Sequence, residues 1–232
     1  MKPEIHAVVL WSNALPQRER ILADLAEHVE LVAAYRVEWP PERFAHNLVR
    51  LYGFKPKQAA VKADDSGRDP FLLLVVRDPA PHYESRPRSW GSSPANTKLY
   101  DAKQRYRIWT DGDFRVHTTI DEEEAERDLF LLLSRRSSEL ADAPAIPWSA
   151  EPELLEAEIV GADGWASTEQ LLAALDVVCG YEVLTEEPLR LRVTDLARAK
   201  QLVGADAPVE LHGEGDRHFV GLARKVRRRL RR

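Results

Sequence analysis

The segment "FLLLVVRD", residues 71–78, holds the longest apolar run in the chain and decides the fold. Six consecutive apolar residues are typical of a strand that is buried on both faces, because a strand with one solvated face alternates apolar and polar residues. Such a strand lies inside a sheet that helices cover on both sides. We therefore predict an α/β (or α+β) fold with a three-layer-like α/β domain at the N-terminus.

Strand and helix patterns alternate before this run. Residues 5–11 ("IHAVVLW") and 29–39 ("VELVAAYRVEW") are strand-like, and apolar residues recur at helical spacing between them, which predicts a β-α-β unit. A helix is predicted in residues 40–53 ("PPERFAHNLVRLYG"), because prolines favour its start and Gly53 its end.

A further strand and helix are predicted after the central run. Residues 98–109 fit a short helix or a helix leading into a strand, and residues 114–120 ("FRVHTTI") alternate like a strand. Residues 121–134 are predicted to form a helix in which Asp121 is the N-cap and Glu124 completes a capping box.

The acidic run at the start of that helix, "DEEEAE", resembles a metal-binding cluster. Capping explains most of it, because carboxylates in the first turn are stabilised by the helix dipole and by free backbone N–H groups. Glu126 and Asp128 lie beyond the first turn. For these two acids a solvated helix face is favoured over a functional role.

Segments rich in proline and small polar residues suggest the domain organisation. Residues 79–97 contain four prolines and four serines, which predicts an irregular surface loop and a candidate substrate lid. We predict a domain in residues 1–135, a Pro/Ala/Glu-rich linker in 136–163, and a small α+β domain in 164–232. The last of these ends in a basic amphipathic helix.

Composition indicates a globular protein without a membrane span. The chain has 232 residues, 44% of them hydrophobic and 31% charged, and no apolar run approaches the length of about 20 residues that crosses a bilayer. The N-terminus lacks the pattern of a secretory signal, so we expect a cytoplasmic protein. The single cysteine, Cys179, excludes an internal disulfide and is interpreted as a buried structural thiol.

The charge is unevenly distributed. The formal net charge of −5 combines +8 in residues 217–232 with −13 in the rest of the chain. A basic terminal helix can bind anionic lipid or nucleic-acid phosphates, but docking against the acidic body is the favoured interpretation. Nucleic acid is therefore not an expected partner.

The common catalytic motifs are absent, and the seven histidines are dispersed without the spacing of a helical zinc site. His117 is the most interesting of them, because an alternating strand places it on the same side as Arg115 and Thr119. A guanidinium beside a neutral imidazole lowers its pKa, which suits a general base. A surface histidine on an edge strand fits the pattern equally well.

Basic and aromatic residues recur in the middle of the chain. Guanidinium and ammonium groups of this kind bind phosphate oxygens and neutralise charge during phosphoryl transfer. Asp78 and Asp101 could bind magnesium or act as a base. The basic and aromatic residues are Lys62, Arg68, Arg86, Arg88, Lys103, Arg105, Arg107, Trp90, Tyr106 and Trp109.

The segments "HAVVLWSNA", "NLVRLYG", "DPFLLLVVRDPAPHYESR" and "YDAKQRYRIWT", followed by "VHTT" and "DLFLLL", carry a resemblance over roughly residues 5–133. They resemble the N-terminal region of bacterial capsular and surface-polysaccharide biosynthesis proteins. Where that pattern has a histidine, this chain has Phe114. The resemblance implies a pocket formed by Lys62, Asp78, Tyr83, Arg86, Asp101, Lys103, Arg107, Trp109, His117, Glu126 and Asp128.

In those proteins the next region resembles a nucleotidyltransferase with paired metal-binding aspartates. The matching residues 181–200, "YEVLTEEPLRLRVTDLARAK", lack both aspartates and carry Arg190 and Arg192 there. Nucleotidyl transfer by two metal ions is therefore not expected. The C-terminal domain is interpreted as a degenerate remnant that serves packing, dimerisation or partner binding.

Two functions are expected from these patterns. The first is a phosphotransferase-type enzyme that acts on a phosphorylated sugar, polyol or nucleotide in surface-glycan or related secondary metabolism, with Mg²⁺ as a possible companion of a nucleotide. In it His117, Asp78, Asp101 and Glu126 are catalytic, and Lys62, Arg86, Lys103, Arg107, Tyr83 and Trp109 bind substrate. The second is a non-catalytic scaffold that binds a protein partner or an anionic polymer through the C-terminal domain and tail.

Overall fold

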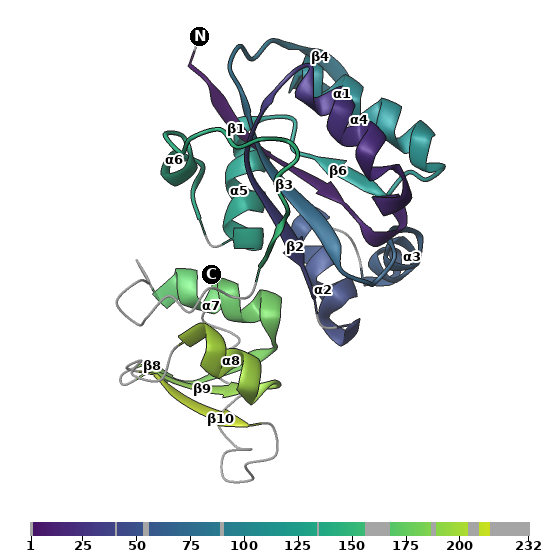
Figure 1. The fold of residues 1–232 in the computed structure, drawn as a ribbon. Helices are drawn as coiled ribbons and strands as arrows, with labels where there is room; N and C mark the ends of the chain where they lie inside the picture. Colours follow the sequence, from purple (N-terminus) through teal and green to yellow (C-terminus); the bar gives the residue numbers. More distant parts are fainter. Residues whose placement is uncertain are drawn as a thin grey trace. The chain divides into compact units, whose positions relative to one another are not determined.

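The structure is a computed structural model that describes residues 2–39, 41–52, 56–88, 91–133, 135–155, 168–186, 189–203 and 209–213. The chain divides into two compact units, Met1–Leu155 and Glu156–Arg232. Helices and strands are mixed in both units (Figure 1), which confirms the predicted fold class. None of the described helices is long and apolar enough to cross a membrane.

Unit 1 is built on a five-stranded sheet in the order β6-β1-β3-β2-β7. Strand β3 is central and pairs antiparallel with both β1 and β2, while β6 pairs antiparallel with β1, and β7 pairs parallel with β2. The strands are β1 (Glu4–Leu10), β2 (Glu30–Val37), β3 (Phe71–Asp78), β6 (Val116–Thr118) and β7 (Glu153–Leu154). The apolar run of residues 71–76 is thus the buried centre of the sheet, as the sequence predicted.

Strands β1 and β2 form a split β-α-β unit. Each strand pairs antiparallel with β3, which lies between them, so β1 and β2 run parallel to each other, as predicted. The 3₁₀ helix η1 (Ser12–Gln17) and helix α1 (Arg18–Ala26) connect the two strands. With helix α4 (Thr97–Thr110) leading into β6, the order of elements and strands is that of the ferredoxin-like, split β-α-β arrangement.

Helices cover both faces of this sheet (Figure 1). On one face, α1 and α4 pack Ile21, Leu25 and Tyr106 against Leu72 and Leu74 of β3. The opposite face carries α2 (Pro41–Tyr52), α3 (Pro56–Ser66) and α5 (Glu122–Leu133). An aromatic cluster anchors α2 on that face, and its members are Trp11, Trp39, Phe44 and Phe71.

The described residues of segment 79–97 contain a pair of antiparallel strands in place of the predicted irregular loop. Strand β4 (Tyr83–Arg88) pairs antiparallel with β5 (Gly91–Asn96), and Asn96 then caps helix α4 through a bond from the Leu99 N–H. Its prolines misled the prediction, because proline is tolerated in a two-stranded ribbon in which one side of each strand forms no ladder. The predicted loop residue Trp90 lies outside the described residues.

Residues 136–155, which were predicted to begin a linker, are part of unit 1. They contain α6 (Ser137–Leu140) and β7, and the Ile146 N–H donates to the Leu31 carbonyl at 2.8 Å. Ile146 and Trp148 also pack against the core beneath α1 and α4. Composition misled here, because a proline-rich segment that packs on a core has the same residue types as a free linker. The division lies after Leu155.

Unit 2 is a small α+β unit, as predicted. Its sheet has the order β10-β9-β8, with β8 antiparallel and β10 parallel to β9, and α7 and α8 supply Leu175 and Leu202 to its core. Cys179 is buried there. The elements are α7 (Thr168–Val178), β8 (Tyr181–Glu186), β9 (Leu189–Val193), α8 (Leu196–Val203) and β10 (Glu210–Gly213). The basic segment 217–232 lies outside the described residues.

Candidate functional site

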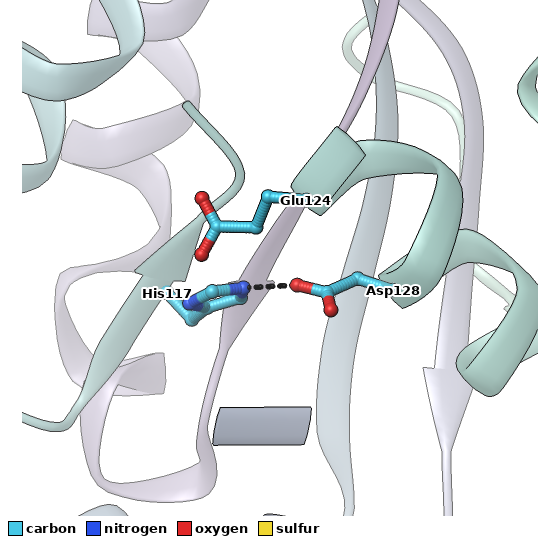
Figure 2. A group of neighbouring side chains, drawn as sticks. All are labelled: His117, Glu124 and Asp128. Atoms are coloured by element: carbon cyan, nitrogen blue, oxygen red, sulfur yellow. Dashed lines mark hydrogen bonds and ion pairs between the residues drawn. The ribbon is translucent and has the colours of Figure 1, made fainter. Parts of the chain in front are cut away.

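The candidate site is centred on a buried histidine–carboxylate pair. Nε2 of His117 on β6 lies 2.7 Å from an Asp128 carboxylate oxygen on α5 (Figure 2), and the two residues are only 1% and 0% exposed. In the neutral imidazole, a proton on Nε2 that is donated to Asp128 leaves the lone pair on Nδ1. Within the described part of the chain, that Nδ1 is buried without a hydrogen-bond partner.

The start of helix α5 aligns Asp128 with the strand. The Glu124 N–H donates to the Asp121 side chain at 2.7 Å, which confirms Asp121 as the N-cap. The Glu124 side chain accepts from the Ile120 N–H at 3.0 Å, one residue before the N–H that a capping box would use. Asp128 follows Glu124 by four residues and so lies on the same helix face. The interpretation of Asp128 as part of a solvated face is wrong, because it is fully buried against His117.

Two basic residues of α4, four residues apart, approach the pair around the edge of the sheet. The Lys103 ammonium donates to the Thr118 carbonyl of β6 at 2.9 Å. Burial and the nearby charge of Arg107 lower the pKa of Lys103 to about 8, although Glu124 and Asp128 act in the opposite direction. Among the described residues, the Arg107 guanidinium forms no ion pair, and its Nε is buried without a hydrogen bond.

Lys62 of α3 extends this basic group. Its ammonium lies 3.6 Å from the centre of the Phe114 ring, a cation–π distance. Partial burial and the charge of Arg107 lower the pKa of Lys62, while Asp113 acts to raise it. Phe114, which replaces the histidine of the resembled pattern, therefore contacts a cation next to the site.

Tyr52, at the end of α2, packs on the His117 ring and was not identified from the sequence. The two rings meet edge to face with centres 4.9 Å apart, and the Tyr52 hydroxyl accepts a hydrogen bond from Trp11 Nε1 at 3.2 Å. A helical tyrosine far along the chain gives no local signal of this contact. Arg115, which was expected beside His117, instead pairs with Asp65.

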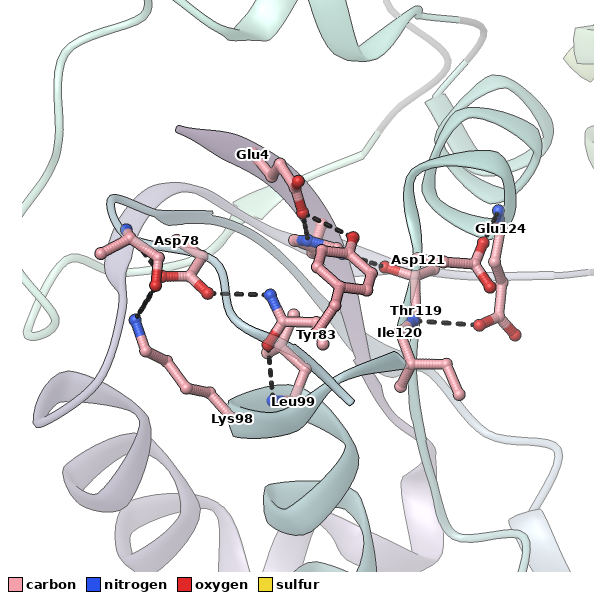
Figure 3. Close-up of polar contacts among 12 residues, drawn as sticks. Glu4, Asp78, Tyr83, Lys98, Leu99, Thr119, Ile120, Asp121 and Glu124 are labelled. Atoms are coloured by element: carbon pink, nitrogen blue, oxygen red, sulfur yellow. Dashed lines mark hydrogen bonds and ion pairs between the residues drawn. The ribbon is translucent and has the colours of Figure 1, made fainter. Parts of the chain in front are cut away.

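Two predicted site residues lie in a different polar network (Figure 3). The Asp78 carboxylate accepts hydrogen bonds from Lys98 and Asn96, at 2.5 and 2.8 Å, and the Tyr83 hydroxyl donates to Glu4 at 2.7 Å. Burial acts to raise the pKa of Asp78, but these hydrogen bonds outweigh it and hold the pKa below its ordinary value.

Asp78 is remote from His117 along strand β1. Glu4 pairs with Asp78, whereas Val9 pairs with His117. Five residues of strand separate the two positions, or about 17 Å. The prediction that Asp78 shares a pocket with His117 is therefore wrong, and the Tyr83 hydroxyl is bonded to Glu4, the β1 residue that pairs with Asp78.

The four remaining predicted residues have local partners of their own. Arg86 forms ion pairs with Glu84 and with Asp101, at 2.6 and 3.5 Å. Trp109 stacks beneath Arg20, whose guanidinium carbon is 3.9 Å from its ring centre. Glu126 accepts a hydrogen bond from the Ser137 N–H at 2.9 Å and pairs with Arg136. These contacts do not connect Arg86, Asp101, Trp109 or Glu126 to the histidine pair.

The residues that the structure brings together are Lys62, Lys103, Arg107, His117 and Asp128. The group also includes Glu124, and His117, Glu124 and Asp128 offer ligand atoms within 4.8 Å of one another (Figure 2). Their oxygens are already engaged, however: Asp128 bonds His117 and also Arg127 at 2.9 Å, and Glu124 bonds the Ile120 N–H. With Lys103, Arg107 and Arg127 nearby, the charges favour an anion over a metal cation.

Comparison with known proteins gives no family for this chain. No protein-family model and no curated protein sequence matches it. The functional argument therefore rests on the geometry around His117.

Proposed function

We propose that unit 1 is a phosphotransferase-type enzyme that acts on a phosphorylated sugar, polyol or nucleotide at the His117 site. The observation that carries the proposal is the His117–Asp128 pair, whose second ring nitrogen is unbonded among the described residues. A histidine that serves packing alone is expected to have both nitrogens satisfied when it is this deeply buried.

The surrounding charges support an anionic substrate. Lys103 and Arg107 form no ion pair within the described residues, so their charges remain available for phosphate oxygens. Lys62 adds a third positive charge close to Arg107. Arginine and lysine neutralise the charge that spreads over the phosphoryl oxygens during transfer.

Each residue then has a role in an in-line transfer. The acceptor hydroxyl oxygen forms a bond to phosphorus, the phosphorus–oxygen bond to the leaving group breaks, and Nδ1 of His117 takes the hydroxyl proton. Asp128 holds the imidazole in the required tautomer and stabilises the imidazolium that forms. Lys103 and Arg107 bind the phosphoryl oxygens, and a nucleotide substrate would bring Mg²⁺ with its phosphates.

The resemblance to surface-polysaccharide biosynthesis proteins supports a role in surface-glycan or related secondary metabolism. It also favours phosphorylated sugars and polyols as the first compounds to test. The scaffold function remains an untested prediction, because its basic tail lies outside the described residues.

The proposal is tested with purified full-length protein. Nucleotides and sugar or polyol phosphates are first screened for a rise in melting temperature, and the compounds that bind are then assayed for phosphoryl transfer. We expect His117→Asn to lower kcat by about 100-fold or more. The matched control is His82→Asn, because His82 is exposed and lies in the β4 region. Equal turnover by wild type and His117→Asn would refute the assigned role.

A further inference from the structure

Lys103 differs from Lys98 and Arg105, two other basic residues of helix α4. Lys98 pairs with Asp78 at 2.5 Å, and Arg105 pairs with Asp24 at 2.6 Å. The Lys103 ammonium has only the Thr118 carbonyl as a hydrogen-bond partner within the described residues. It is a partly buried cation without a carboxylate partner, which is an unfavourable environment for its charge.

The charged groups around Lys103 come from several elements and nearly balance. Glu124 and Asp128 of α5 favour its protonated form, while Arg107 of α4 and Arg88 of β4 oppose it. The two acids already bond other groups, since Asp128 bonds His117 and Arg127, and Glu124 accepts from the Ile120 N–H. Because these charges nearly cancel, burial dominates and lowers the pKa of Lys103 to about 8.

An anion bound in the site would change the balance of charges around the Lys103 ammonium. A phosphate or sulfate held by Arg107 and facing His117 would add negative charge beside the Lys103 ammonium and supply the charged acceptor that the ammonium lacks. An opposite charge within about 4–6 Å typically raises the pKa of a lysine strongly. Lys103 would then be protonated in every complex.

We propose that Lys103 couples anion binding at the His117 site to the uptake of one proton. The inference rests on the proposed function, because it assumes that the site binds a phosphate-like anion. It makes binding pH-dependent: between about pH 8 and pH 10 the affinity falls by up to tenfold per pH unit, because the free protein must first gain the proton. Below about pH 7 the affinity becomes independent of Lys103 titration.

The test uses sulfate, which neither gains nor loses a proton in this range. Isothermal titration calorimetry of the full-length protein at pH 9, in two buffers with different ionisation enthalpies, gives the number of protons taken up. We expect most of one proton per sulfate at pH 9 and about a tenth at pH 7. Lys103→Arg keeps the positive charge but does not titrate, so it should bind sulfate with no proton uptake.

Two further variants complete the design. Lys103→Met should bind sulfate more weakly and also without uptake, which covers the case in which the arginine does not fit beside Thr118. His117→Asn should still take up the proton at pH 9, because the coupling is assigned to Lys103. Thermal melts establish that each variant is folded.

The outcomes separate the inference from the function it rests on. Sulfate binding with no proton uptake by wild type, or with equal uptake by Lys103→Met, overturns the coupling and leaves the proposed anion site intact. Absence of sulfate binding, together with absence of binding by every phosphorylated compound of the screen, overturns both.

Discussion

Two buried histidines of the same sheet each contact a carboxylate, and they differ in what remains unbonded. His6 on β1 uses both ring nitrogens, one with Thr119 at 3.2 Å and one with Glu4 at 3.3 Å. His117 on β6 uses only Nε2, and basic residues surround its pair. Burial beside an acid is common to both histidines, so the role proposed for His117 rests on its unbonded ring nitrogen.

The largest expected difference between the two pairs concerns turnover. Asp128→Asn cannot hold the Nε2–H tautomer as the carboxylate does, so we expect kcat to fall by roughly 10²–10⁴-fold. The equivalent change at the other pair, Glu4→Gln, should leave kcat within about threefold of wild type. Steady-state assays of both variants with the same phosphorylated substrate measure this, and equal losses would contradict the distinction.

Asp78, near the His6 pair, is expected to matter for stability and not for turnover. Asp78→Ala leaves Lys98 and Asn96 without their carboxylate and should lower the free energy of unfolding by about 3 kcal/mol. Urea unfolding monitored by circular dichroism measures the loss. Activity below the unfolding transition should be unchanged, and a loss of activity without a loss of stability would return Asp78 to the catalytic group.

The same carboxylate sets a pH dependence. The folded-state pKa of Asp78 is below its ordinary value, so its stabilising contribution is present above about pH 4 and is lost as the pH falls through the folded pKa. The stability difference between wild type and Asp78→Asn should therefore shrink in acid. Urea unfolding at pH 3 and pH 7 tests the sign, and a difference that grows at pH 3 would contradict it.

The smallest effect is expected at the exposed pair of Asp101 and Arg86. Asp101→Asn removes one of two acids that contact Arg86 at the surface, so neither kcat nor the melting temperature should change measurably. A tenfold fall in kcat would show that Asp101 belongs to the site after all.

Local patterns predicted elements well because short-range physics determines them. The run of residues 71–76 predicted the central strand, and Asp121 with Glu124 predicted the start of α5. Proline and serine content failed for residues 79–97 and 136–155, because composition does not report backbone pairing or packing.

The candidate site was predicted only in part, for a geometric reason. The prediction was right that Lys62, Lys103 and Arg107 lie near His117. A strand has two ends, however, and the sequence does not say which end of each strand lies beside which helix. Asp78 was therefore assigned to the wrong end of the sheet. The contact of Tyr52 with His117 joins residues 65 positions apart and has no local signature.

The account is tested most directly by nitrogen-15 NMR of the histidine side chains. For His117 we predict that the proton shared with Asp128 is on Nε2, that Nδ1 has a lone pair, and that the Nδ1 resonance shifts when sulfate is added. The His6 resonances should not respond. A His117 ring protonated on Nδ1, or one that responds to sulfate no more than His6 does, would contradict the claim that this nitrogen is available for chemistry.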